Sequence, residues 1–416
     1  MARSAPVVLV HSGWNRYNFG DVAHTPGLLR LLEAHLPEAE VLLWMASHPD
    51  WLKGYIGARF PAVRCFSGSL GGAEGPVSPA VEEAFGRADL FVFNSGPIFN
   101  YGHRIEPGAP VRRTGWRGFD WNATMAPAAK LYYAKSRGVP FGIFAQGFIY
   151  LAPPADAVLP DILSQAAFLT TRETDSLAYL NELGVEASDM AFVPDAAWAF
   201  DLRDDAPVLA WMQKHSLEEG CFLAATTRNA PAGVDEEADA QRQKAFWTPL
   251  IRRWIEETGL PVALLPETVT SIELNRRYIY EPLPDAIKEK VILDDSLWTP
   301  AEEFWTPDQA LSLLSRARAY CNVDHHGVLL ALAAGVPCVH PRQSQAGRKA
   351  QVLDDLGVAE WLFDIEADDA KKVGDALLAI DRDYGAARHK AAEAARRAAE
   401  LQAGRMRAIR SLLGLF

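Results

Sequence analysis

CNVDHHGVLLALAAGVPCVH, residues 321–340, contains a short apolar strand, an apolar helix and a second short strand in direct succession. Two histidines and a glycine stand where the first strand ends and the helix begins. This order of segments is typical of a βαβ unit, in which the two strands run parallel. The stretch therefore predicts an α/β fold with a parallel sheet.

The same alternation of apolar strands and helices recurs along the rest of the chain. It breaks in the charged segment 201–219 and starts again at CFLAATTRNA, residues 221–230. Two such series predict two Rossmann-like, doubly wound α/β domains, at 1–205 and 215–380. We expect a cleft between these domains, because ligands of parallel sheets bind beyond the carboxyl ends of the strands.

The C-terminal segment 381–416 is rich in alanine and arginine, which favours one long helix. We expect this helix to pack on or across the two domains. The alternative is a basic amphipathic helix that lies on a membrane surface.

The bulk composition is that of an ordinary globular protein, with 49% hydrophobic and 23% charged residues. A net charge of −12 argues against nucleic acid as a partner. The four cysteines form no CxxC pair, so their spacing supports neither a zinc site nor a disulfide framework. The N-terminus lacks the long apolar core of a signal peptide, and no stretch reaches the length of a membrane span. We therefore expect a cytoplasmic protein.

Small and polar residues follow nearly every predicted strand, where a substrate of such a fold binds. Those that we predict to contact the substrate, besides the basic residues below, are Asn18, Asp21, Asn94, Ser95, Gly96, His103, Gln146, Asp195 and Glu267. The first of these loops precedes a helix that begins near Val22, and a helix N-terminus offers free N–H groups to an anion. Asp21 equally fits a simple N-cap of that helix.

Two arginines hold equivalent places after strands in the two predicted domains. Arg172 lies in TTRETDS, residues 170–176, and Arg228 lies in TTRNA, residues 226–230. A guanidinium at such a place suits the carboxylate or phosphate of an anionic substrate. For Arg172 the alternative is an ion pair within its own loop, with Glu173 or Asp175.

Asp324, His325 and His326 are the predicted catalytic residues. A histidine at a helix start is suited to act as a general acid or base, or to contact a phosphate. A metal site is disfavoured, because successive side chains on an ending strand point in opposite directions and no HxxxH spacing occurs. The chain also lacks a GxSxG elbow, a P-loop and a GxGxxG fingerprint.

The chain resembles the polysaccharide pyruvyl transferase family over residues 6–370. The segments that carry the likeness are NFGD at 18–21, DLFVFNSGPIF at 89–99, FGIFAQGFIYL at 141–151, LTTRETDSLAYLNELGV at 169–185, FVPDAAWAF at 192–200 and HHGVLLALAAGVPCV at 325–339. The resemblance implies a two-domain, glycosyltransferase-B-type fold. It also implies transfer of the enolpyruvyl unit of phosphoenolpyruvate, as a donor substrate and without a permanently bound cofactor, to a sugar of a glycan.

The resemblance also suggests roles for two residues. Arg172 matches the arginine of the family's R-x-x-x-S motif, which would hold the donor carboxylate. His326 matches the histidine of its R-x-H motif, which would contact the phosphate and assist protonation. The family's arginine two places earlier is Asp324 here, which reverses a charge beside the expected phosphate. Arg228, Arg348 or Lys349 would compensate, or this chain uses another donor or reaction.

Two further functions stay open at this point. One is another carbohydrate-active enzyme on the same fold, either a nucleotide-sugar glycosyltransferase or a lyase or hydrolase acting on acidic sugars, with Asp324 and His326 as an acid/base pair. A carboxylate beside a histidine favours proton abstraction, which suits that chemistry. The other is a sugar-phosphate sensor without catalytic activity.

Overall fold

The computed structural model forms two compact units. Unit 1 consists of residues 1–15, 24–199 and 398–416, and unit 2 of residues 16–23 and 200–397. The structure describes residues 5–12, 15–45, 49–71, 75–96, 99, 121–148, 151, 155–229, 235–298 and 304–415. The predicted substrate residue His103 lies outside these residues.

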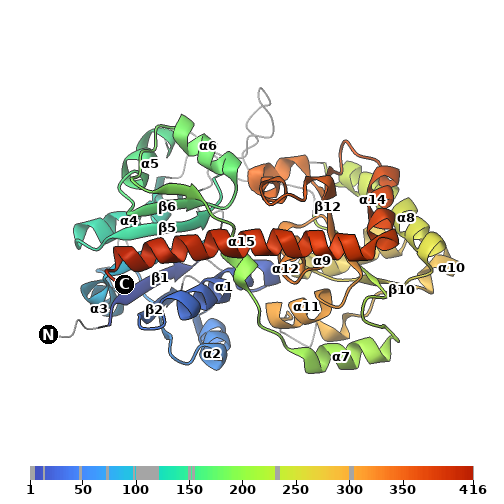
Figure 1. Ribbon diagram of the computed structural model, residues 1–416, viewed down its shortest axis with the longest axis horizontal. Coiled ribbons are helices and arrows are strands. Elements are labelled where there is room, and N and C mark those ends of the chain that lie inside the picture. The colour runs from blue at the N-terminus through green and yellow to red at the C-terminus, as the bar shows by residue number, and fades with distance from the viewer. Residues whose placement is uncertain are drawn as a thin grey trace. The chain divides into compact units, whose positions relative to one another are not determined.

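Unit 1 is built on a seven-stranded parallel sheet with the strand order β3-β2-β1-β4-β5-β6-β7. Its strands are β1 (Val7–Ser12), β2 (Glu40–Met45), β3 (Arg64–Phe66), β4 (Leu90–Phe93), β5 (Phe141–Gln146), β6 (Phe168–Thr171) and β7 (Met190–Phe192). Its helices are α1 (Phe19–His35, beginning in unit 2), α2 (Pro49–Arg59), α3 (Pro79–Arg87), α4 (Trp121–Ser136), α5 (Ala155–Leu163), α6 (Thr174–Glu182) and the 3-10 turn η1 (Ala196–Ala199). Helices flank this sheet on both faces (Figure 1).

Unit 2 contains a six-stranded parallel sheet with the order β10-β9-β8-β11-β12-β13. The strands are β8 (Leu223–Thr226), β9 (Val262–Leu264), β10 (Val291–Ile292), β11 (Ala319–Asn322), β12 (Cys338–Arg342) and β13 (Leu362–Asp364). The α-helices are α7 (Asp205–Lys214), α8 (Glu236–Thr258), α9 (Val269–Leu274), α10 (Asp285–Lys288), α11 (Pro307–Leu314), α12 (His325–Ala333), α13 (Val352–Asp355), α14 (Ala370–Arg382) and α15 (Tyr384–Leu412, ending in unit 1). A π-helical turn, η2 (Asn275–Tyr280), follows α9, and the 3-10 turns are η3 (Asp295–Leu297), η4 (Ser344–Gln351) and η5 (Ala359–Trp361).

The predicted α/β fold with two parallel sheets is confirmed. Every residue of β1, β4 and β5 in unit 1 and of β8 and β11 in unit 2 is buried. Helices cover both faces of a parallel sheet, and this explains why these strands are continuous apolar runs in the sequence. The polar residues that follow them are thereby concentrated at the carboxyl edge of each sheet.

Residues 16–23, which include the first turn of α1, belong to unit 2. Asn18 forms an antiparallel bridge with Thr268, and the backbone N–H of Phe19 donates to the carbonyl of Glu267 over 3.2 Å. The Phe19 ring also lies edge-on to Trp305, with 5.5 Å between ring centroids. The first turn of α1 is therefore fixed within unit 2, and the helix continues into unit 1 from His24 onward.

The β11–α12–β12 segment has the predicted strand, helix and strand. Asp324 has extended dihedral angles and its carboxylate accepts the N–H of His325, so it is the N-cap of α12. The last helical residues give way to Gly335, whose φ of +74° is a conformation that glycine adopts without strain. All residues of α12 from His325 to Leu332 are buried, which places the helix in the interior of unit 2.

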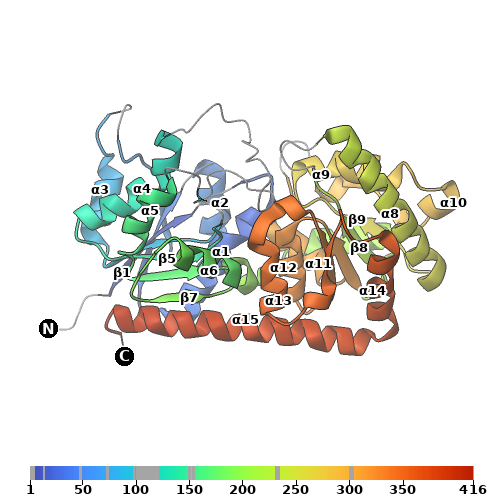
Figure 2. The ribbon, with the colours of Figure 1, turned by 90° about the horizontal axis from the view of Figure 1, so that it is seen from above.

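The helix nearest the C-terminus is α15, 29 residues long (Figure 2). Its alanines Ala391 and Ala394 are buried in unit 2, and Ala398 is buried in unit 1. Small side chains let a helix backbone approach its neighbours closely. Within the described ranges, no helix combines the length and the apolar character that crossing a bilayer requires.

Candidate functional site

The carboxyl ends of four adjacent strands in unit 2 bring most of the predicted site residues together. Arg228 follows β8, Glu267 follows β9, and Asp324 and His326 follow β11. Lys349 comes from η4, beyond the end of β12. With the Asn18–Asp21 loop, these residues form one cluster, here called the α12 site.

Asp324 lies between a helix start and two cations. Its Oδ1 accepts a hydrogen bond from Nη1 of Arg228 over 2.9 Å and lies 3.9 Å from Nζ of Lys349. Burial alone would raise the pKa of Asp324, but the charges of Arg228, Lys349 and His326 outweigh burial and hold that pKa below its ordinary value. Asp324 is therefore an ionised carboxylate, and the sum over Asp324, Arg228 and Lys349 is one net positive charge.

Glu267 is fully buried beside the same helix start. Its carboxylate accepts three hydrogen bonds, from Nδ2 of Asn322 (2.7 Å) and from the backbone N–H groups of His326 (3.1 Å) and Gly327 (2.9 Å). Burial and the nearby charge of Asp324 raise the pKa of Glu267, whereas the bonds from Asn322 and Gly327 act in the opposite direction. Together the carboxylates of Glu267 and Asp324 bond to the first three N–H groups of α12.

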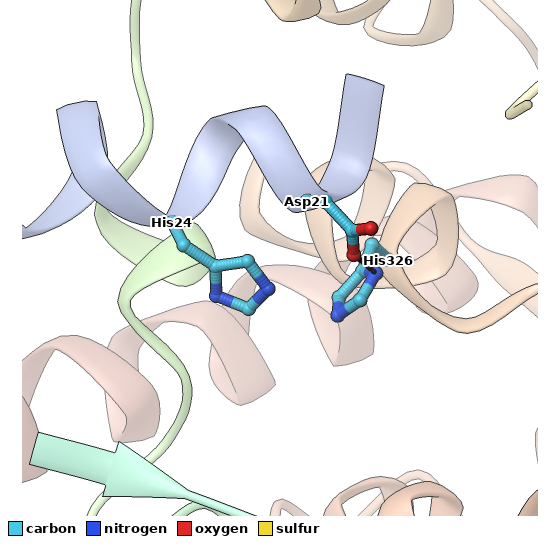
Figure 3. Close-up of side chains that lie close together, drawn as sticks. All are labelled: Asp21, His24 and His326. Atoms are coloured by element: carbon cyan, nitrogen blue, oxygen red, sulfur yellow. Dashed lines mark ion pairs between the residues drawn. The ribbon is translucent and has the colours of Figure 1, made fainter. Parts of the chain in front are cut away.

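Two carboxyl groups lie beside one nitrogen of the His326 ring. Its Nδ1 is 3.5 Å from Oδ1 of Asp21 and 3.8 Å from Oε1 of Glu267. Figure 3 shows the Asp21 carboxylate facing the His326 ring, with His24 one turn further along α1. Gly20 makes this approach possible, because a Cβ at that position would lie 2.1 Å from Cβ of His326.

His325 and His340 lie deeper in unit 2, and both side chains are fully buried. Nδ1 of His340 bonds to the carbonyl oxygen of Asn322 over 2.7 Å. Burial lowers the pKa of His340 to about 4, so this ring is neutral at physiological pH. The His325 ring lies 5.9 Å from that of His340. The predicted catalytic role of His325 stays a prediction, and its burial gives it a packing role in this structure.

A second polar cluster lies at the carboxyl ends of β1, β4, β5, β6 and β7 in unit 1. It contains the predicted residues Asn94, Ser95, Gln146, Arg172 and Asp195, all of them buried. Nδ2 of Asn94 donates to Oγ of Ser12 over 3.3 Å, and Nε2 of Gln146 donates to the Asn94 carbonyl. The N–H of Gly147 donates to the carbonyl of Gly96, which places that predicted residue at the same edge.

Arg172 has the intraloop partner that the sequence offered as an alternative, together with a second one. Its Nε lies 3.4 Å from Oε2 of Glu173, and its Nη1 lies 3.5 Å from Oδ2 of Asp195. The guanidinium is packed against Gly147, where a Cβ would lie 2.5 Å from Nε. Arg172 is thus a buried, paired cation, and its predicted contact with a substrate carboxylate stays a prediction.

His24 and Asn322 are polar residues of these clusters that were not among the predicted site residues. Nδ1 of His24 lies 2.6 Å from Oδ1 of Asp195 and 2.8 Å from Oγ of Ser95. Asn322 ends β11 and donates to Glu267. The three-residue spacing from Asp21 to His24 was a usable signal, because it places both side chains on neighbouring positions of one helix face.

Comparisons with known proteins identify the family and the fold. The family model described as polysaccharide pyruvyl transferase matches residues 18–340. A search of curated proteins finds no significant match. Solved structures match along nearly the whole chain, which shows a glycosyltransferase-B-like fold.

Three of these structures illustrate the likeness. The Staphylococcus aureus MnaA–UDP complex has a TM-score of 0.59 at 11% identity, covering 99% of this chain and 98% of that chain. Anabaena Alr3699/HepE in complex with UDP and glucose has a TM-score of 0.57 at 11% identity, covering 98% and 99%. The UDP-N-acetylglucosamine 2-epimerase of Rickettsia bellii has a TM-score of 0.50 at 13% identity, covering 97% and 98%. At such low identity the likeness concerns the fold alone.

Proposed function

We propose, because the chain belongs to the polysaccharide pyruvyl transferase family, that it transfers the enolpyruvyl unit of phosphoenolpyruvate to a sugar of a glycan. Membership of this family implies a transferase. In the proposed reaction the methylene carbon of the donor takes up a proton. Two sugar hydroxyls then bond to the adjacent carbon as their protons leave, and inorganic phosphate departs. The product is a cyclic ketal.

The position of His326 is the observation that carries this proposal. The Asp21 carboxylate lies 3.5 Å from its Nδ1, and the charge of that carboxylate stabilises the protonated ring. A protonated imidazole is a suitable general acid for the methylene carbon of the donor. The same ring, once neutral, is suited to accept a proton from an attacking hydroxyl.

Arg228 and Lys349 are the groups that we assign to the donor phosphate. Both belong to the α12 site, and their charges exceed that of Asp324 by one. The Arg228 side chain is 31% exposed, so its guanidinium is accessible to a ligand while Asp324 holds one of its nitrogens. Preorganised cations of this kind stabilise a departing phosphate. Among these three residues, Asp324 thus reduces the positive charge without reversing it.

The experiment is to mix the protein with phosphoenolpyruvate and a panel of sugars, and to measure phosphate release. We expect release with at least one acceptor, and a fall of about 10²- to 10⁴-fold in His326→Gln, as expected for loss of a general acid. His389→Gln, on the exposed side of α15, is the matched control and should keep the full rate. No release from the unmodified protein across a broad panel would disprove the proposed reaction.

One observation favours a second candidate, an acid/base enzyme that modifies sugars without an anionic donor. The first three N–H groups of α12 bond to carboxylates and so are not offered to a phosphate. His326 would then act as the base, with Asp21 stabilising its protonated form. An unsaturated or cleaved sugar product, formed without phosphoenolpyruvate, would identify this activity.

A further inference from the structure

Glu267 is a fully buried carboxyl group in contact with three separate segments of unit 2. Its carboxylate bonds to the backbone N–H groups of His326 and Gly327 at the start of α12. It also accepts Nδ2 of Asn322, at the end of β11. Its own carbonyl oxygen accepts the N–H of Phe19, in the first turn of α1, which carries Asp21. One residue thus bonds to both segments that place groups around the His326 ring.

Two glycines give this carboxylate and the neighbouring ring their space. A Cβ at Gly327 would lie 2.7 Å from Oε2 of Glu267 and 2.7 Å from Nδ2 of Asn322. A Cβ at Gly20 would overlap His326 and lie 3.1 Å from Oε1 of Glu267. Any other residue at either position would push the carboxylate or the ring out of place. The packing is therefore specific to this arrangement of Glu267 and His326.

A carboxyl group is unusual at a fully buried position such as this one. A buried carboxylate costs free energy unless hydrogen bonds and nearby charges compensate for the lost water. Asp324, a second carboxylate, adds to that cost, as the raised pKa of Glu267 reflects. An uncharged residue would cap α12 at lower cost. A carboxyl group in this place is best explained by an effect on the neighbouring imidazole.

We infer that Glu267 is a positioning residue for His326. It holds the backbone of His326 through the 3.1 Å bond and lies 3.8 Å from its Nδ1, on the same side of the ring as Asp21. Nδ1 then carries the proton that faces the carboxylates, and Nε2 is the nitrogen that we assign to proton exchange with the substrate. Glu267 is fully buried, and its predicted contact with the substrate stays a prediction. Its role in turnover rests on the proposed function, whereas its effect on the ring does not.

The test compares Glu267→Gln and Glu267→Ala with the unmodified protein, first by NMR and then by turnover. Amide exchange followed by NMR reports on the N–H groups of His326 and Gly327. We expect exchange about 100-fold faster in Glu267→Ala, and less change in Glu267→Gln, which keeps one acceptor oxygen. The ¹⁵N spectrum of the His326 ring, assigned with His326→Gln, should show the Nδ1–H tautomer in the unmodified protein and a mixture in the variants.

Turnover supplies the second measurement. We expect kcat for phosphate release to fall about tenfold or more in both variants while KM for phosphoenolpyruvate stays within about threefold, because the lost interaction acts on the acid and not on the donor. Glu273→Gln, an exposed carboxyl group on α9, is the matched control and should change none of these values. A fall in kcat with unchanged exchange and ring spectra would overturn the inference.

Failure of the proposed function leaves a different signature. If the unmodified protein releases no phosphate, the amide exchange and the ring spectra still decide whether Glu267 positions His326. Altered spectra in both variants would then support the positioning role. Unaltered spectra would overturn it. Failure of both variants to fold would assign Glu267 to the stability of unit 2 and would also overturn it.

Discussion

Asp324 affects the binding of an anionic donor in two opposite ways, by repelling the phosphate and by ordering the Arg228 side chain. A single substitution tests which effect is larger. The Asp324 carboxylate repels a phosphate, but its 2.9 Å bond to Arg228 also fixes a guanidinium that would otherwise lose side-chain freedom on binding. Asparagine is as good an N-cap as aspartate, so Asp324→Asn removes the charge and keeps the cap of α12.

We expect Asp324→Asn to raise KM for phosphoenolpyruvate by about threefold to tenfold, since the bond from Arg228 would lose its ionic part and order the guanidinium less before binding. Steady-state phosphate release measures this, and thermal unfolding should confirm an unchanged fold. A lower KM in Asp324→Asn would mean that repulsion exceeds the anchoring effect. Arg228→Ala should raise KM as well, and more strongly, because it removes the cation itself.

His340 gives the stability of unit 2 a defined pH dependence. Its pKa falls from 6.5 in the unfolded chain to about 4 in the folded protein, chiefly through burial. The folded state therefore resists protonation of His340. The contribution of this group to the unfolding free energy is fully present above pH 6.5 and is lost as the pH falls toward 4. The expected loss is about 3 kcal/mol.

The measurement is chemical denaturation of the protein and of His340→Asn between pH 7 and 4. Asparagine has an amide that can replace the Nδ1–H donor to the Asn322 carbonyl but does not titrate in this range. We expect the unfolding free energy of the variant to fall less steeply with decreasing pH. Equal slopes in both proteins would contradict the burial argument.

At the scale of elements, the first turn of α1 and the start of α12 depend on glycine. Gly20→Ala would place a Cβ 2.1 Å from Cβ and 2.9 Å from Cγ of His326, so α1 or the start of α12 would have to shift. We expect it to destabilise unit 2 by about 1–3 kcal/mol through overpacking, and to reduce activity further by displacing His326. Unfolding in urea and phosphate release measure the two effects.

Gly54→Ala is the control for this prediction. Gly54 lies in α2, and a Cβ there meets no atom within 4 Å. Alanine should stabilise that helix by about 0.5–1 kcal/mol, because glycine is a poor helix former. If both variants shifted stability in the same direction, overpacking against His326 would not explain the effect of Gly20→Ala.

The strands and their polar ends were predictable, because buried parallel strands appear as uninterrupted apolar runs. The β11–α12–β12 segment is an example, with its strand, cap and helix in the predicted order. The placement of residues 16–23 in unit 2 was not predictable, because the bridge from Asn18 to Thr268 joins residues 250 positions apart. The burial of Glu267 was not predictable for the same reason, namely that its partners are distant in the sequence. Its three donors come from the distant residues 322–327.

At the scale of the whole molecule, α15 contributes to the cores of both units. In unit 1, Met406 and Ile409 are buried and Arg405 pairs with Asp189. In unit 2, Ala391 and Ala394 are buried. A destabilising substitution in one half of α15 can therefore show whether the two cores unfold together or separately.

Met406→Ala and Leu401→Ala form a matched pair for this question. Met406 is fully buried in unit 1 and Leu401 is 38% exposed on the same helix. We expect Met406→Ala to cost about 2–5 kcal/mol, as for a core methionine, and Leu401→Ala to cost no more than about 0.5 kcal/mol. Amide exchange should quicken in β6 and β7 of unit 1 and stay unchanged in β11 and β12 of unit 2, because each unit has its own sheet and core. Equal quickening in both sheets would show instead that the two units unfold as one cooperative block.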